Sequence, residues 1–164
     1  MNGGGRLSTF SLGGLLFGVE ALAVQEVIRT LPITPVPLAP AVVAGLANLR
    51  GQVVTAIDLA RRLGLPPQPG APPPSMHVVL KCEGGPVSLL VDEIGEVVEA
   101  DAAAFEPPPA TLVGPARELI RGAFKLEGRL LLVLDPLRTA RVHDPVRVAK
   151  PGAEAPGCPG EVTG

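Results

Sequence analysis

Acidic and histidine side chains are the residues best suited to acid–base or metal chemistry, and in this chain they do not form a catalytic set. Asp92, Glu93 and Glu96 lie close together and resemble a carboxylate pair, but the pattern supplies no histidine or other partner for them. We interpret them as a solvated turn between strands. His77 and His143 are not spaced for joint metal binding. The sequence therefore predicts a protein that is not an enzyme and has no metal and no cofactor.

Two glycine pairs, Gly13-Gly14 and Gly84-Gly85, are the candidates for phosphate-binding loops. Neither pair opens a helix that continues with Lys and then Ser or Thr, so we expect both to be hairpin turns. The net charge of −2 gives no basic surface for nucleic acid. With no Trp, no Tyr and only four Phe, the chain also lacks the aromatic platform on which single strands stack. We therefore predict no nucleic-acid partner.

Glu26 and Arg50 are the charged residues with the strongest functional signal, because each interrupts an otherwise apolar, strand-like segment. An unpaired charge in such a segment would cost several kcal/mol of desolvation. Our hypothesis is that the two side chains form a partly exposed ion pair that orients the Arg50 guanidinium at a surface groove. The alternative is two independent surface charges, whose heads would lie more than ~4 Å apart.

Arg50 also marks the difference between two copies of a repeated pattern. The segment 45–58 returns at 122–135 with the same spacing. The counterpart of Arg50 is Glu127, so one charge is reversed between the copies. A repeated scaffold with one reversed charge indicates structure in both copies and function in one. The matched residues are Gly45 and Gly122, Leu49 and Leu126, Gly51 and Gly128, and Asp58 and Asp135, and further upstream 24–28 matches 94–98.

Short apolar runs separated by turn residues predict strands rather than long helices. Asp58 and Asp135 follow the repeated hairpins and predict N-caps of short helices, the first of which covers 59–63 and stops at Gly64. Regularly spaced short strands in a duplicated chain are typical of two small all-β barrels. The predicted strands are 6–12, 15–19, 45–50, 52–57, 76–82, 86–91, 120–126 and 129–134.

Proline and glycine divide the chain into lobes. The proline-rich segment 66–75 can form neither a helix nor a central strand, and we interpret it as a linker. It separates a first lobe at approximately 7–65 from a second lobe at 76–141, and together they make one domain over 7–141. We expect a flexible N-terminus at 1–6 and a disordered tail at 142–164.

The apolar content is higher than two small barrels can bury. Hydrophobic residues make up 46% of the chain, and the mean hydropathy is +0.37. We therefore expect part of the apolar surface to be an interface, and exposed strand edges to invite pairing with another barrel. The N-terminus lacks the apolar run of a signal peptide, and the longest apolar stretches fall far below the ~20 residues of a membrane helix. These features predict an intracellular protein without direct membrane insertion.

One specific string in the first copy consists of Gly45, then Asn48-Leu49-Arg50-Gly51, and then Asp58-Leu59. With this string as its most specific part, the pattern resembles the CheW-like adaptor family of bacterial chemosensory systems. The resemblance implies an all-β fold of two five-stranded Src-homology-3-like barrels with short helices. It also implies a non-catalytic adaptor that couples the cytoplasmic tip of methyl-accepting chemoreceptors to a CheA-type histidine kinase, located in the cytoplasm at membrane-associated receptor arrays. The other matching residues are Val24 to Val27, Pro37, Pro40, Arg61, Leu63, Gly64, Val91, Asp92, Val97, Gly122 and Leu126 to Asp135.

Two contact surfaces follow from this resemblance. The family's receptor-contact groove lies between the lobes, and the kinase contact uses an apolar face of the first barrel near the hairpin at 45–57. Each lobe would present a surface, and a shift between lobes would pass a signal along. The receptor-binding residues carried over are Val24, Glu26, Gly45, Arg50, Gly51, Met76 and Val97. The kinase-binding residues expected are Val42, Val43, Leu46 and Val53.

Two further functions stay open at the level of the sequence. One is a regulatory enzyme fragment, either a detached kinase regulatory domain or a small hydrolase. The absence of a nucleotide-binding motif and of a phosphorylatable histidine in a helical bundle argues against it. The other is a self-assembling CheW-like module that serves a chemosensory pathway unrelated to motility.

Overall fold

The computed structural model describes residues 5–142, and about half of these residues lie in short strands. Predictions for 1–4 and for 143–164, including His143, lie outside the described residues. Gly5 and Arg6 belong to the first strand, so the prediction of a flexible N-terminus at 1–6 is wrong for these two residues. The strands are β1 (Gly5–Leu12), β2 (Leu15–Glu20), β3 (Val24–Ile28), β4 (Ile33–Thr34), β5 (Val43–Leu49), β6 (Gln52–Asp58), β7 (Met76–Leu80), β8 (Val87–Val91), β9 (Glu93–Ala100), β10 (Ile120–Leu126) and β11 (Arg129–Leu134). The helices are η1 (Ala21–Ala23), α1 (Leu59–Leu63), η2 (Ala102–Ala104), α2 (Pro115–Leu119) and α3 (Pro136–Ala140).

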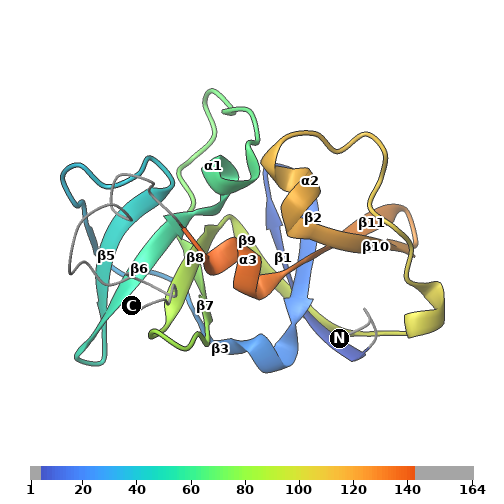
Figure 1. Ribbon diagram of the computed structural model, residues 1–164, viewed down its shortest axis with the longest axis horizontal. Helices are drawn as coiled ribbons and strands as arrows, with labels where there is room; N and C mark the ends of the chain where they lie inside the picture. Colours follow the sequence, from blue (N-terminus) through green and yellow to red (C-terminus); the bar gives the residue numbers. More distant parts are fainter. Residues whose placement is uncertain (1–4, 143–164) are drawn as a thin grey trace, which may run out of the picture.

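The strands form two sheets that lie side by side in Figure 1. Sheet A has the order β10-β11-β2-β1-β9, and sheet B has the order β3-β7-β8-β6-β5-β4. Sheet B counts six strands because one segment of the chain contributes both β3, which pairs with β7, and β4, which pairs with β5. The corresponding segment of sheet A leaves β9 and reaches β10 through a bridge between Glu106 and Ala123. The all-β prediction with two barrel-like sheets is confirmed.

The predicted division into successive lobes at 7–65 and 76–141 is wrong, because each sheet takes strands from both halves of the chain. The β1–β2 hairpin pairs with β9 and, in parallel, with β11. The β7–β8 hairpin pairs with β3 and, in parallel, with β6. The two repeats therefore exchange their first hairpins. The proline-rich segment 66–75 follows α1 and joins β6 to β7 within sheet B, so it does not separate two barrels.

The two copies of the repeat share the strand register of their hairpins. The β5–β6 and β10–β11 hairpins each contain one irregularity, at the residue before the repeated glycine. At Gly45 an added Cβ would collide with the carbonyl of Thr34, and at Gly122 it would collide with the carbonyl of Glu106. A glycine is needed in both places because another strand segment crosses the hairpin there. The glycines are therefore part of the scaffold in both copies.

Both predicted helix caps are confirmed. The Asp58 carboxylate accepts a hydrogen bond from the Arg61 backbone N–H at 3.2 Å, and α1 ends at Gly64 with a left-handed φ of 74°. The Asp135 carboxylate accepts the equivalent bond from Arg138 at 3.0 Å and starts α3. A carboxylate at this position satisfies an otherwise unpaired N–H group of the first helical turn.

The largest apolar core is shared by the two sheets. It combines Phe10 and Phe17 of sheet A, whose ring centroids are 5.9 Å apart, with Ile57 and Leu89 of sheet B. Leu59 of α1 is buried in the same core. Val142, the last described residue, packs against this core as well, so Val142 is not part of the tail that was predicted at 142–164. A core common to both sheets holds them as one packed unit.

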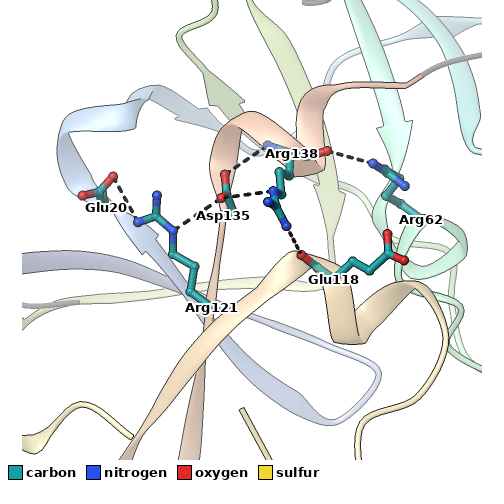
Figure 2. Close-up of polar contacts among 6 residues, drawn as sticks. All are labelled: Glu20, Arg62, Glu118, Arg121, Asp135 and Arg138. Atoms are coloured by element: carbon teal, nitrogen blue, oxygen red, sulfur yellow. Dashed lines mark hydrogen bonds and ion pairs between the residues drawn. The ribbon is translucent and has the colours of Figure 1, made fainter. Parts of the chain in front are cut away.

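A polar network ties the helices that follow the two repeated hairpins (Figure 2). Arg62 of α1 donates hydrogen bonds to the backbone carbonyls of Arg138, Thr139 and Arg141 at 2.8, 3.2 and 3.0 Å. Burial lowers the pKa of the Arg62 guanidinium, and the carboxylate of Glu118 opposes that change. Arg62 thus satisfies carbonyls at the C-terminal end of α3 and links sheet B to sheet A. The network continues through Arg138 to the Glu118 carbonyl, through Asp135 to Arg121 at 3.5 Å, and from Arg121 to Glu20 at 3.9 Å.

Candidate functional site

The predicted ion pair between Glu26 and Arg50 is present. Glu26 lies on β3, Arg50 lies in the turn between β5 and β6, and Nη1 of the arginine contacts Oε2 of the glutamate. The Glu26 side chain is 20% exposed, whereas the Arg50 side chain is 73% exposed. The acid therefore belongs to the body of the protein, and the guanidinium is displayed at its surface.

A small apolar cluster supports this pair from below. Leu49, Val54 and Val79 are buried together, and Ile28 packs against them. Val79 is the register partner of Glu26 on β7, and Leu49 directly precedes Arg50. The cluster thus fixes the end of the β5–β6 hairpin against β3 and β7, which brings together two charges that are far apart in the sequence.

The turn that carries Arg50 has an unusual backbone conformation. Arg50 has a φ of 54° and Gly51 a φ of 86°, so both central residues of this two-residue turn are left-handed. That combination is the type I′ turn favoured in tight hairpins, although it is strained for a residue with a Cβ. The Asn48 side-chain oxygen accepts a hydrogen bond from the Gly51 N–H at 2.8 Å. The sequence reasoning missed this role of Asn48, although an asparagine just before a glycine turn is a recognisable signal.

The second copy of the hairpin does not build the same site. Lys125 occupies the position of Asn48 and approaches Glu106 at 3.9 Å. Glu127 occupies the position of Arg50, and it is not among the described non-glycine residues with positive φ. Glu96, the counterpart of Glu26, is exposed on β9. Both counterparts of the ion pair are acidic, so the second copy cannot form it.

The other predicted receptor-contact residues fall into four groups. Gly51 is exposed beside Arg50, so the structure brings Glu26, Arg50 and Gly51 together. Val24 on β3 and Met76 on β7 are half-buried and pack against the shared core. Gly45 is buried, and its lack of a side chain lets the hairpin pack against Thr34. Val97 lies on β9 of sheet A, opposite Ser8 of β1, and is 53% exposed.

The predicted kinase-contact residues lie on the β5–β6 hairpin and at its base. Leu46 and Val53 alternate with buried neighbours and point away from the core, with exposures of 37% and 63%. Val42 and Val43 are half-buried where the hairpin begins. Two exposed branched side chains on one strand pair form an apolar surface that is suited to contact with another protein.

Two of the candidate acid–base residues have structural roles. Asp92 accepts a hydrogen bond from the Gly13 N–H at 2.9 Å and so holds the turn between β1 and β2. His77 is buried, its Nδ1 lies 2.7 Å from the Ser88 hydroxyl, and burial lowers its pKa. Residues 5–142 contain no group of three His, Cys, Asp or Glu side chains that could hold a metal. Over the same residues, no helix has the length and apolar character needed to cross a membrane.

A pocket of about 440 Å³ lies beside the proline-rich segment. Its walls combine Leu12, Leu65 and prolines with the charged side chains of Asp58, Arg61 and Asp92. Asp58 caps α1 and Asp92 holds the β1–β2 turn, so two of these charged groups already have structural partners. The pocket therefore brings together no nucleophile with a base.

Comparisons with known proteins agree with this geometry. The family model described as the CheW-like domain matches residues 6–143. A chemotaxis protein CheW of Rhizobium meliloti is 34% identical over 136 residues, covering 82% of this chain and 86% of that protein. One from Treponema pallidum is 30% identical over 133 residues, covering 79% and 78%. The crystal structure of the scaffolding protein TtCheW from Thermoanaerobacter tengcongensis superposes with a TM-score of 0.70 at 27% identity, covering 80% of this chain and 89% of that one. With a family match across nearly all of the described residues, this chain belongs to the CheW-like domain family.

Proposed function

We propose that this protein is a non-catalytic adaptor that couples chemoreceptors to a CheA-type histidine kinase. The observation that carries the proposal is the Glu26–Arg50 pair, which displays one guanidinium on a scaffold of the CheW-like family. The two relatives described above are named as chemotaxis proteins, and the solved structure as a scaffolding protein. The partners proposed are proteins, namely a receptor and a kinase, at membrane-associated arrays in the cytoplasm.

The receptor surface is proposed to be centred on Arg50. Its guanidinium keeps donor groups free beside the one that binds Glu26, so a partner that offers carboxylates or carbonyl oxygens can add hydrogen bonds. Val97 would add apolar contact from sheet A, whereas Val24 and Met76 would shape the surface from below. Gly45 would contribute by letting the hairpin approach the segment that contains Thr34.

The kinase surface is proposed to be the outer face of the β5–β6 hairpin. Leu46 and Val53 supply exposed apolar area there, and Val42 with Val43 extend it toward the base of the hairpin. A contact between two such barrels typically buries about 1,200–2,000 Å², with apolar residues at its centre. Since Arg50 lies in the turn of the same hairpin, one element would serve both partners.

The test is a charge reversal, Arg50→Glu, with Arg129→Glu as the matched control. Arg129 is the exposed arginine just after the turn of the equivalent hairpin. Arg50→Glu leaves Glu26 facing a like charge and removes the displayed donors, a change that costs about 2–5 kcal/mol at a closely paired site. We expect binding to a receptor-tip fragment to fall at least thirtyfold and receptor-dependent control of kinase activity to be lost.

The control variant should bind as the wild type does, and both variants should retain the wild-type circular dichroism spectrum. Retained coupling in a folded Arg50→Glu protein would refute the assignment of the receptor surface. A nucleotide-hydrolysis assay addresses the alternative of a regulatory enzyme fragment, and turnover above background would argue for that alternative.

A further inference from the structure

We propose that Asn48 is the positioning residue that holds Arg50 against Glu26 before a partner binds. The inference rests on the proposed function of Arg50 and adds a residue that acts through the turn. Asn48 is exposed on the outer side of β5, opposite Val53. Its side chain turns back toward the hairpin end, where its oxygen accepts the Gly51 N–H at 2.8 Å.

This hydrogen bond stabilises a backbone conformation that arginine avoids. Arg50 has a φ of 54°, in the left-handed region where a Cβ is crowded by the following carbonyl group. Asparagine side chains favour such turns by accepting a backbone N–H a few residues further along the chain. The bond from Gly51 to Asn48 spans Arg50, and it directly restrains the peptide group that follows Arg50.

The chain contains its own comparison in the β10–β11 hairpin. The glycine is kept there, with Gly128 at a φ of 72°, but Lys125 replaces Asn48 and has no oxygen acceptor on its side chain. Glu127 is then not among the described non-glycine residues with positive φ. The shared glycine therefore does not by itself impose the left-handed conformation on the residue before it. Besides the ion pair itself, the Arg50 turn is distinguished by the acceptor that Asn48 supplies.

The sign of φ sets the direction in which the Cα–Cβ bond of the turn residue points. A change from left-handed to right-handed φ rotates the Cα–Cβ bond about the backbone and directs the guanidinium elsewhere. Arg50 is largely exposed, so its own packing restrains it little. Holding it at Glu26 in the free protein removes part of the ordering cost that binding would otherwise carry.

A double-mutant cycle tests this role. Binding of a soluble chemoreceptor-tip fragment is measured by fluorescence anisotropy for wild type, Asn48→Ala, Arg50→Ala and the double variant, with Lys125→Ala as the matched control. We expect Asn48→Ala to weaken binding about three- to tenfold, the effect of one hydrogen bond. The double variant should bind no more weakly than Arg50→Ala alone, and Lys125→Ala should bind as the wild type does. Asn48→Asp, which keeps the acceptor oxygen, should restore most of the affinity.

Two further readouts separate this inference from the proposed function. In the free protein, Asn48→Ala should accelerate hydrogen exchange of the Gly51 amide and of the Arg50 Nη1 protons that contact Glu26, and unchanged exchange at both would overturn the inference. An Asn48→Ala penalty that persists in the Arg50→Ala background would also overturn it, because Asn48 would then contact the partner directly. If Arg50→Ala itself has no effect on binding, the receptor surface is misassigned, and the exchange measurements alone decide the role of Asn48.

Discussion

Replacing Arg62 with methionine should destabilise the fold more than the same replacement of Arg61, the exposed arginine of α1. The Arg62 guanidinium donates to three carbonyls at the end of α3, at 2.8, 3.0 and 3.2 Å, from a half-buried position. A methionine of similar length preserves much of the packing of the stem but leaves those carbonyls without their donor. The change therefore isolates the polar contribution of the link between the two sheets.

The expected magnitude follows from the number of bonds and their setting. A hydrogen bond from a charged donor contributes about 1.5–3 kcal/mol, so three independent bonds would set an upper bound near 4.5–9 kcal/mol. The three bonds share one guanidinium, and water can reach part of the end of α3 once the side chain is gone, so the losses do not add. We expect a loss of about 2–4 kcal/mol in the free energy of unfolding, a large part of the roughly 5–15 kcal/mol typical of a domain.

Urea denaturation followed by circular dichroism measures this loss, and Arg61→Met is the matched control. Arg61 is next to Arg62 in α1, but its side chain is 64% exposed and pairs with Asp58 at 3.4 Å. Such a surface pair contributes about 0–1 kcal/mol, so the control should remain close to wild type. Arg62→Lys should fall between the two, because a single ammonium cannot reproduce the planar fork. Equal stability of Arg62→Met and Arg61→Met would refute the reasoning.

Two further predictions concern pH and topology. Burial lowers the pKa of His77 in the folded state, so below the ordinary pKa of 6.5 the unfolded chain binds the proton more readily than the folded protein does. The contribution of His77 to stability is therefore complete above pH 6.5 and is lost as the pH falls below that value. Urea denaturation at pH 7.5 and 5.5 should show this loss of stability, up to about 1.4 kcal/mol per pH unit. The double variant His77→Leu with Ser88→Ala should have a weaker pH dependence, and an unchanged pH dependence would contradict the account. Because the repeats exchange hairpins, fragments cut between Gln68 and Pro72 should each lack stable structure and regain the native spectrum as a one-to-one complex when mixed; a fragment that folds alone would count against the exchanged topology.

Local features of this fold can be predicted from sequence because short-range contacts impose them. The two Asp caps, the Gly64 stop and the hairpins around Gly51 and Gly128 follow from residue types that few other conformations accept. The Glu26–Arg50 pair was predictable because charges in apolar strands need partners. These predictions needed no knowledge of which strands meet.

The exchange of hairpins could not be predicted in the same way. The β1–β2 and β7–β8 hairpins are both short antiparallel pairs that open their repeats, so local residue types do not decide which sheet either hairpin joins. The choice depends on contacts between distant segments, and the usual preference for neighbouring strands pointed to the wrong pairing. Arg62 was missed for a related reason: a charge on a short helix is usually exposed, and its carbonyl partners lie more than 70 residues away.

The exchanged topology bears on how an adaptor of this kind would transmit a signal. Movement of sheet A against sheet B would have to separate Phe10 and Phe17 from Ile57 and Leu89 in the shared core, and it would also break the three bonds of Arg62. Close-packed side chains resist such sliding, and exposing even two or three of them would cost several kcal/mol. The sequence had suggested that a shift between lobes passes the signal, but these contacts favour a rigid spacer. In that arrangement Arg50 and the Leu46–Val53 surface would keep a fixed separation on one hairpin, and the proposed adaptor would transmit the position of one partner to the other.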